Sequence, residues 1–124
     1  MRILLADDHA VVRRTLRLII TEEIMTANIV EVADADELMD RVMHEPWDLV
    51  ISDISMPGSS GLEVLQQIRR NFPNLPVLIL SASPKEQYAA RVLKAGASGY
   101  LNKEAAGDEL VNAIHCILSG NKYI

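Results

Sequence analysis

Residues 49–58 read LVISDISMPG, an apolar run that reaches an acidic residue and continues into a turn. The run 49–51 is apolar without a break, a pattern that predicts a strand buried on both faces. Pro57 and Gly58 mark a turn after it. Asp53 is therefore expected just past the end of a buried strand.

Short apolar runs alternate with segments of helical periodicity along the whole chain. Four more runs predict strands, at residues 3–6, 28–32, 76–80 and 99–101, and the charged end of the second run favours an edge position. Buried strands separated by helices predict a parallel sheet covered on both faces, the doubly wound α/β class. The helices are predicted from apolar residues at helical spacing: Val12, Leu16, Ile19 and Ile20; Leu38 and Val42; Leu62, Leu65 and Ile68; Ala89, Val92 and Leu93, before Gly96; and Leu110, Ile114, Ile117 and Leu118.

The composition is that of an ordinary folded domain. The 124 residues are 49% apolar and 23% charged, enough for one domain with its own core. Twelve Lys and Arg against seventeen Asp and Glu give a net charge of −5, so this segment alone is not expected to bind nucleic acid, which demands a basic surface. We assign residues 1–120 to one domain and residues 121–124 to the start of a linker.

The chain carries no sign of export. Its single cysteine, Cys116, rules out an internal disulfide and fits a reducing compartment. Arg2 is followed by only four apolar residues before Asp7 and Asp8, too few for a signal peptide. No apolar run approaches the ~20 residues of a membrane span. We expect a cytoplasmic protein without membrane contact.

Polar side chains stand where the predicted strands end. Asp7 and Asp8 follow the first strand and Asp53 follows the third. Ser81 follows the fourth strand and Lys103 the fifth. The carboxyl ends of parallel strands share one edge, where open α/β sheets bind ligands, so these five groups are expected together.

This set of groups suits phosphoryl transfer. Two carboxylates ~4 Å apart repel by roughly 4 kcal/mol at an effective dielectric near 20, and Mg²⁺, which favours carboxylate oxygens, offsets that repulsion. A metal, an ammonium and a hydroxyl can orient a transferring phosphoryl group, and Asp is a known phosphoryl nucleophile. We therefore predict that Asp53 attacks phosphorus while Asp8 and Asp7 hold Mg²⁺. Ser81 and Lys103 would hold the phosphoryl oxygens.

Four motifs then carry a resemblance to a known family. They are Asp7-Asp8, the segment 53–58, Ser81-Ala82 and the segment 99–103. Over its whole length the chain resembles the response-regulator receiver domain of two-component systems. The resemblance implies a flavodoxin-like (βα)5 fold with a five-stranded parallel sheet in the order 2-1-3-4-5 and helices on both faces.

The resemblance also implies a metal site and its ligands. Asp53 would be the phosphorylation site and a metal ligand, and Asp8 the principal Mg²⁺ carboxylate. Asp7 would assist through water, and the backbone carbonyl of Ser55 would complete the metal shell.

Three further residues gain roles from the same resemblance. Ser81 would be the switch hydroxyl, Lys103 the phosphate-binding lysine and Tyr100 an aromatic rotamer switch. Such a domain is not an enzyme beyond its own phosphorylation and dephosphorylation.

Asp7-Asp8-His9, Gly99-Tyr100-Leu101 and residues 117–121 are similar to receivers that precede a LuxR/NarL-type helix-turn-helix domain. That similarity implies a sensor histidine kinase as phosphoryl donor. It also implies a missing C-terminal domain that binds DNA and regulates transcription. A homodimer formed on phosphorylation is a further partner that the family suggests.

Three departures from the family pattern concern the site. Glu104 stands where receivers often have proline, and a cis bond to a non-proline costs ~2.5–4 kcal/mol, so we expect a trans bond and a less firmly placed Lys103. Ser81 replaces the commoner threonine and lacks its stiffening methyl. Ser55 and Ser83 are small and would leave water a route to the acyl phosphate.

Simpler structural roles compete with these assignments. Asp7 and Asp8 could be helix N-caps, and Lys103 a solvated surface charge. Ser81 is a common residue of strand-to-helix loops, and Tyr100 could be a packing aromatic.

Other residues have a plain structural reading. Arg13, Arg14 and Arg17 predict a solvated helix face, which could also help a kinase dock. His9 is expected in the first turn of a helix. Cys116 is expected in or near the core.

Two other functions compete with the signalling switch. A phosphohydrolase like the haloacid dehalogenases would need Asp-x-Asp after the first strand, but His9 lies two residues beyond Asp7 and Ala10 two beyond Asp8. A binding module independent of phosphorylation would not need the complete set of acids and Lys103.

Overall fold

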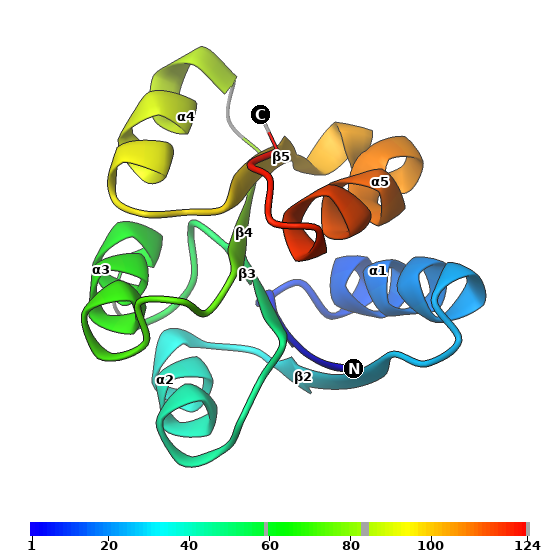
Figure 1. Cartoon of the computed structure of the whole chain (residues 1–124), viewed down its shortest axis with the longest axis horizontal. Helices are drawn as coiled ribbons and strands as arrows, with labels where there is room; N and C mark the ends of the chain where they lie inside the picture. The colour runs from blue at the N-terminus through cyan, green and yellow to red at the C-terminus, as the bar shows by residue number, and fades with distance from the viewer. Residues whose placement is uncertain (59, 83–84, 124) are drawn as a thin grey trace.

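The computed structural model describes residues 1–58, 60–82 and 85–123, with the backbone alone over 85–88 (Figure 1). Strands and helices alternate along these residues, as predicted. The strands are β1 (Arg2–Ala6), β2 (Asn28–Val32), β3 (Leu49–Asp53), β4 (Val77–Ser81) and β5 (Gly99–Asn102). The helices are α1 (Ala10–Glu23), α2 (Ala35–His44), α3 (Gly61–Asn71), α4 (Lys85–Lys94) and α5 (Ala106–Leu118), with a short 3₁₀ helix, η1 (Lys103–Ala105), before α5.

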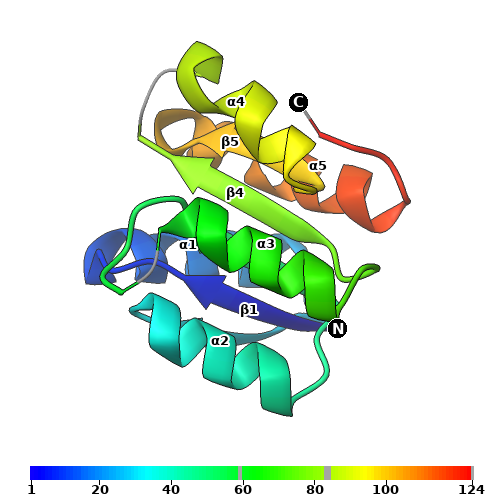
Figure 2. The same cartoon turned by 90° about the vertical axis from the view of Figure 1, so that its left-hand side faces the viewer.

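The five strands form one parallel sheet in the order β2-β1-β3-β4-β5, which confirms the predicted fold and the edge position of β2. Helices α1 and α5 cover one face, and α2, α3 and α4 cover the other (Figure 1). In Figure 2 the arrows of β1 and β4 point the same way, so the carboxyl ends of the strands gather along one edge.

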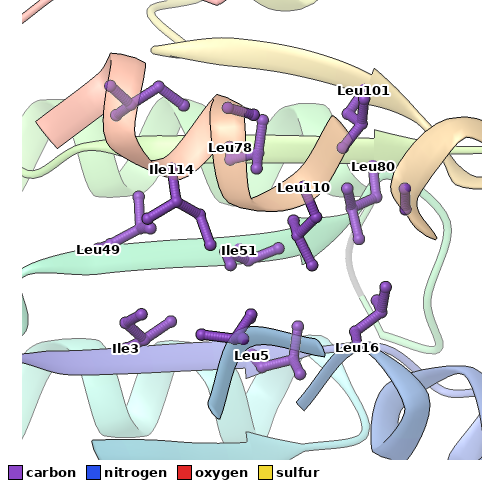
Figure 3. Packing of buried hydrophobic residues seen from close by; sticks show 14 of the residues in the cluster. Ile3, Leu5, Leu16, Leu49, Ile51, Leu78, Leu80, Leu101, Leu110 and Ile114 are labelled. Atoms are coloured by element: carbon purple, nitrogen blue, oxygen red, sulfur yellow. The ribbon is translucent and has the colours of Figure 1, made fainter. Parts of the chain in front are cut away.

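The sheet separates two hydrophobic cores. Ile3 and Ile51 belong to the core beneath α1 and α5, which Figure 3 shows, whereas Leu4 and Val50 belong to the core beneath α2, α3 and α4. Successive side chains of a strand point to opposite faces, so an apolar run without alternation supplies both cores. Each fully buried Leu or Ile contributes roughly 1.5–3 kcal/mol, which makes the sheet a rigid base for the loops at its edge.

Two helix starts next to the carboxyl edge are capped by their own side chains. Asp34 accepts from the backbone N–H of Glu37 at 2.8 Å at the start of α2, and Ser60 accepts from Glu63 N–H at 3.2 Å at the start of α3. Such caps satisfy N–H groups that a helix leaves unbonded at its first turn.

Beyond α5 the described chain folds back onto the sheet. Gly120 adopts a left-handed φ of 94°, and Tyr123 then forms a parallel bridge with Gly99 at the start of β5. A Cβ on Gly99 would lie 3.0 Å from the Tyr123 carbonyl oxygen, so glycine permits this close approach. The Tyr123 hydroxyl donates to Glu109, and this bond raises the pKa of Tyr123 to about 12. The division at residue 120 stays a prediction.

Over the described residues, none of the helices combines the length and the apolar character that crossing a membrane requires.

Candidate functional site

The predicted polar residues meet at the carboxyl edge of the sheet. Asp7 follows β1, Asp53 ends β3, Ser81 ends β4 and Lys103 begins η1 directly after β5. Asp53 and Ser81 are the last residues of their strands rather than the first of the loops, so the backbone pairing of the sheet fixes the positions of both. Asp7, Asp53 and Ser81 are all buried, with 0%, 3% and 0% of their surfaces exposed.

Lys103 lies between two of the carboxylates. Its Nζ donates to Asp53 Oδ2 at 2.9 Å and forms an ion pair with Asp7 Oδ2 at 2.9 Å. Burial acts to lower the pKa of Lys103, but the contacts with Asp53 and Asp7 outweigh burial and raise it. The solvated-surface alternative for Lys103 is therefore wrong, since its side chain is only 14% exposed.

The Lys103–Glu104 bond is trans, as expected, because the described residues contain no cis peptide bond. Asn102 accepts from the Glu104 N–H at 2.9 Å and starts η1, a short helix that the sequence did not predict. The expected looser placement of Lys103 does not follow, because two carboxylates hold its ammonium.

Asp53 lies where its negative charge is unfavourable. Burial raises its pKa, and repulsion from Asp7 adds to this effect. Hydrogen bonds from Lys103 and from the Ser55 N–H, 3.2 Å from Asp53 Oδ1, oppose the shift without cancelling it. An additional cation beside Asp53 would favour the ionised carboxylate that nucleophilic attack needs.

The acids at this edge fit a divalent cation. Ligand atoms of Asp7, Asp8, His9 and Asp53 all lie within 4.8 Å of one another. Asp7 Oδ1 accepts from the His9 N–H at 2.9 Å, and the buried Asp7 Oδ2 lies 2.9 Å from the Lys103 ammonium. Three carboxylates close together repel one another, and such an oxygen-rich donor set suits Mg²⁺. The carbonyl of Ser55 stays a predicted ligand.

Neither acid after β1 is the N-cap of α1, which corrects that alternative. The N-cap is His9, whose side chain makes no capping hydrogen bond. His9 Nδ1 instead lies 3.2 Å from Asp7 Oδ1 and 3.2 Å from Asp8 Oδ1. His9 therefore belongs to the rim of the site. It is the N-cap that precedes α1 rather than a residue of the first turn, which corrects the prediction for His9.

The switch candidates are both buried. Ser81 ends β4 beside Asn102, and Tyr100, only 2% exposed, belongs to the core beneath α2, α3 and α4. Burial agrees with the packing alternative for Tyr100 and also with one end state of a rotamer switch, so both switch roles stay predictions. Ser83 lies outside the described residues.

The arginines of α1 correct a second expectation in part. Arg13 is not part of a solvated face, because its side chain is only 16% exposed, whereas Arg17, at 49%, agrees with the expectation. Both donate to Glu31 on β2, each at 2.9 Å. These hydrogen bonds lower the pKa of Glu31, and the bond from Arg17 has the largest effect. Arg13 also donates to the backbone oxygen of Asp7 at 2.6 Å, a contact with the site that sequence patterns did not reveal. Arg14 remains exposed.

Comparison with known proteins identifies the family. A family model described as the response regulator receiver domain matches residues 3–115. The chain belongs to this family. The receiver domain is 38% identical over 125 residues to the oxygen regulatory protein NreC of Staphylococcus carnosus, covering 100% of this chain and 58% of that protein. It therefore spans little more than half of this curated relative.

Solved structures agree with this assignment. A LuxR-family two-component response regulator from Aurantimonas sp. SI85-9A1 matches with a TM-score of 0.91 and 35% identity, over 99% of this chain and 88% of that one. The RcsB response regulator of Salmonella typhimurium matches with a TM-score of 0.92 and 28% identity, over 100% of this chain and 62% of that one. This receiver domain is thus of the LuxR/NarL type.

Proposed function

We propose that Asp53 accepts a phosphoryl group from the phosphohistidine of a sensor histidine kinase in an Mg²⁺-dependent reaction. One observation carries the proposal: the buried carboxylates of Asp53 and Asp7 meet the Lys103 ammonium at one edge of the sheet, where ligand atoms of Asp7, Asp8 and Asp53 lie within 4.8 Å of one another. A structural ion pair with Lys103 needs only one carboxylate, whereas three clustered carboxylates repel one another and gain from a bound metal cation.

In the proposed reaction an Asp53 oxygen forms a bond to phosphorus as the bond from phosphorus to the imidazole nitrogen breaks. The imidazole keeps the electron pair of that bond. Mg²⁺, when bound by Asp8, Asp53 and Asp7, supplies positive charge to the transferring oxygens. Lys103 is already hydrogen-bonded to Asp53 Oδ2, so its ammonium can pass to a phosphoryl oxygen with little movement. The Ser81 hydroxyl would donate a hydrogen bond to another phosphoryl oxygen.

Phosphorylation would then shift a two-state equilibrium. New contacts from the phosphoryl group to Ser81 and Lys103 favour one arrangement of the segment after β4, and Tyr100 would follow. The surface formed by α4, β5 and α5 would change as a result, and a homodimer formed on phosphorylation is one readout of that change.

The outward face of α1 is our candidate for kinase docking. Val11 and Leu18 lie on it with 80% and 61% of their surfaces exposed, one helical heptad apart. Because Glu31 holds Arg13 and Arg17, the electrostatic part of docking falls mainly to exposed Arg14. This helix begins beside Asp8, so a partner on it reaches the phosphorylation site.

The output of the whole protein is proposed from its relatives. RcsB from Salmonella enterica serovar Typhimurium, 28% identical with a TM-score of 0.87, has been solved bound to a promoter in the presence of the phosphomimetic BeF3⁻. By analogy, a DNA-binding domain beyond this chain would regulate transcription. The cytoplasmic location stays a prediction.

Beryllofluoride binding tests the proposal. With Mg²⁺ present, addition of BeF3⁻ should shift the backbone amide NMR signals around Asp53, Ser81 and Lys103, and Asp53→Asn should abolish the shifts. Asp40→Asn, the same exchange on an exposed face of α2, serves as the matched control and should respond like the unchanged chain. Equal responses in the Asp53→Asn variant would refute the assignment.

A further inference from the structure

The side chain of Arg13 donates hydrogen bonds both to β2 and to the turn that follows β1. Its Nε donates to Glu31 Oε1 at 2.9 Å, and its Nη1 donates to the backbone oxygen of Asp7 at 2.6 Å. Both side chains of the Arg13–Glu31 pair are largely covered, with 16% and 17% of their surfaces exposed. The pair therefore links the edge strand β2 to the end of β1.

The turn from Asp7 to His9 is held from several sides. The Asp7 N–H donates to the Val32 carbonyl at 3.1 Å, and the Arg13 N–H donates to the His9 carbonyl at 2.9 Å. Arg13 thus bonds the last residue of the turn through its backbone and the first through its side chain. Asp8 lies between these two attachment points, so Arg13 limits how far the two acids can move relative to each other.

Arg17 provides an internal comparison. It donates to the other carboxylate oxygen of Glu31 at 2.9 Å and carries the same charge as Arg13. Its side chain is more exposed, at 49%, and this hydrogen bond goes to Glu31 rather than to the turn. The two arginines share one partner, and Arg13 adds the contact with Asp7.

We infer that Arg13, held in place by Glu31, is a positioning residue that orients Asp7 and Asp8 for Mg²⁺. The inference rests on the proposed function, because it concerns the metal that phosphoryl transfer would use. Groups that orient metal ligands commonly alter metal affinity by 10–100-fold when removed.

A positioning role and a purely electrostatic role for Arg13 predict opposite changes in Mg²⁺ affinity when its side chain is removed. Removing a positive charge near the site would strengthen the binding of a cation if Arg13 acted only through its charge. Removing an orienting contact would weaken the binding, because the ligands must then be ordered when the metal arrives.

The test measures Mg²⁺ dissociation constants by titration calorimetry on the unchanged chain and on Arg13→Ala, Arg17→Ala and Arg13→Lys. We expect about tenfold weaker binding for Arg13→Ala. Arg17→Ala should remain within about twofold of the unchanged chain. Arg13→Lys should fall between them, because one ammonium cannot reproduce the planar fork that reaches both Glu31 and Asp7. Thermal unfolding without Mg²⁺ shows whether each variant is folded.

The possible outcomes distinguish a failure of the Arg13 inference from a failure of the proposed Mg²⁺ site. Mg²⁺ binding by Arg13→Ala that is as tight as, or tighter than, that of the unchanged chain would overturn the inference alone. An equal loss in Arg17→Ala would also overturn it, by showing that the Glu31 pairing matters and the Asp7 contact does not. If Arg13→Ala does not fold, unchanged affinity in Arg13→Lys overturns it. Failure of the unchanged chain to bind Mg²⁺, or binding that Asp8→Asn leaves intact, would instead refute the proposed metal site.

Discussion

Asp53 combines a reactive role with an unfavourable environment. Its carboxyl is nearly inaccessible at the end of β3, and burial, with repulsion from Asp7, keeps its pKa raised in spite of Lys103. The charge that attack on phosphorus requires is therefore a charge that the folded state accommodates poorly. Active-site groups commonly lower stability in this way, and bound Mg²⁺ would offset the cost.

Replacing this carboxylate should stabilise the fold without metal. Asp53→Asn keeps the side-chain shape and an acceptor for Lys103 but removes the buried charge, so we expect the free energy of unfolding to rise by about 1 kcal/mol near neutral pH. Chemical denaturation in the presence of a chelator measures this. Asp40→Asn, on the exposed face of α2, should change it little.

The pH dependence of that gain follows from the raised pKa of Asp53. Below the ordinary value of 3.8 the carboxyl is protonated in both the folded and the unfolded chain, so the variant has no advantage there. Above the raised folded pKa the buried charge costs its full amount, and the advantage is complete. A stabilisation that does not change between acid and neutral pH would contradict burial of the charge as its cause.

The α3–β4 and α4–β5 connections are joined by one arginine. Arg69 of α3 donates through Nη1 to the carbonyls of Phe72, Pro73 and Leu75 and through Nε to the carbonyl of Gly96 at 3.0 Å. Gly96 has a φ of 108°, and a Cβ there would lie 2.9 Å from Arg69 Cγ, so glycine serves both the turn and the contact. Burial lowers the pKa of Arg69, yet a guanidinium stays charged.

Removing this side chain should loosen both connections. Arg69→Met keeps much of the apolar stem but leaves several carbonyls without their donor, so we expect the free energy of unfolding to fall by about 2 kcal/mol. Arg70→Met, at the exposed neighbouring position of the same helix, is the matched control. Equal denaturation midpoints for the two variants would show that the carbonyl contacts contribute nothing.

At the scale of the whole molecule, parallel topology explains why the sequence predicted most of the site. Every strand of such a sheet ends at the same edge, so Asp7, Asp53 and Lys103 could be placed together without knowledge of any contact distance. Strand bounds needed only unbroken apolar runs, and those predictions differ from the structure by a few residues at most.

The contacts around the site could not be predicted from the sequence, because they depend on tertiary packing. Arg13 and Glu31 are 18 residues apart, and their pairing depends on how α1 lies across β2, which packing rather than local pattern decides. A charged residue in a helical pattern is normally expected to face solvent, so the sequence pattern did not indicate that Arg13 contacts Asp7. The return of Tyr123 to β5 likewise depends on the space left beside Gly99.

The central claim is that Asp53 is the phosphoryl acceptor, and phosphorylation by a small donor tests it most directly. Intact-mass spectrometry of the chain incubated with acetyl phosphate and Mg²⁺ should show one added phosphoryl group, which is lost when a chelator removes the metal and absent in Asp53→Asn. Asp40→Asn should be modified like the unchanged chain. An unmodified wild-type chain, or the same added mass in Asp53→Asn, would contradict the account.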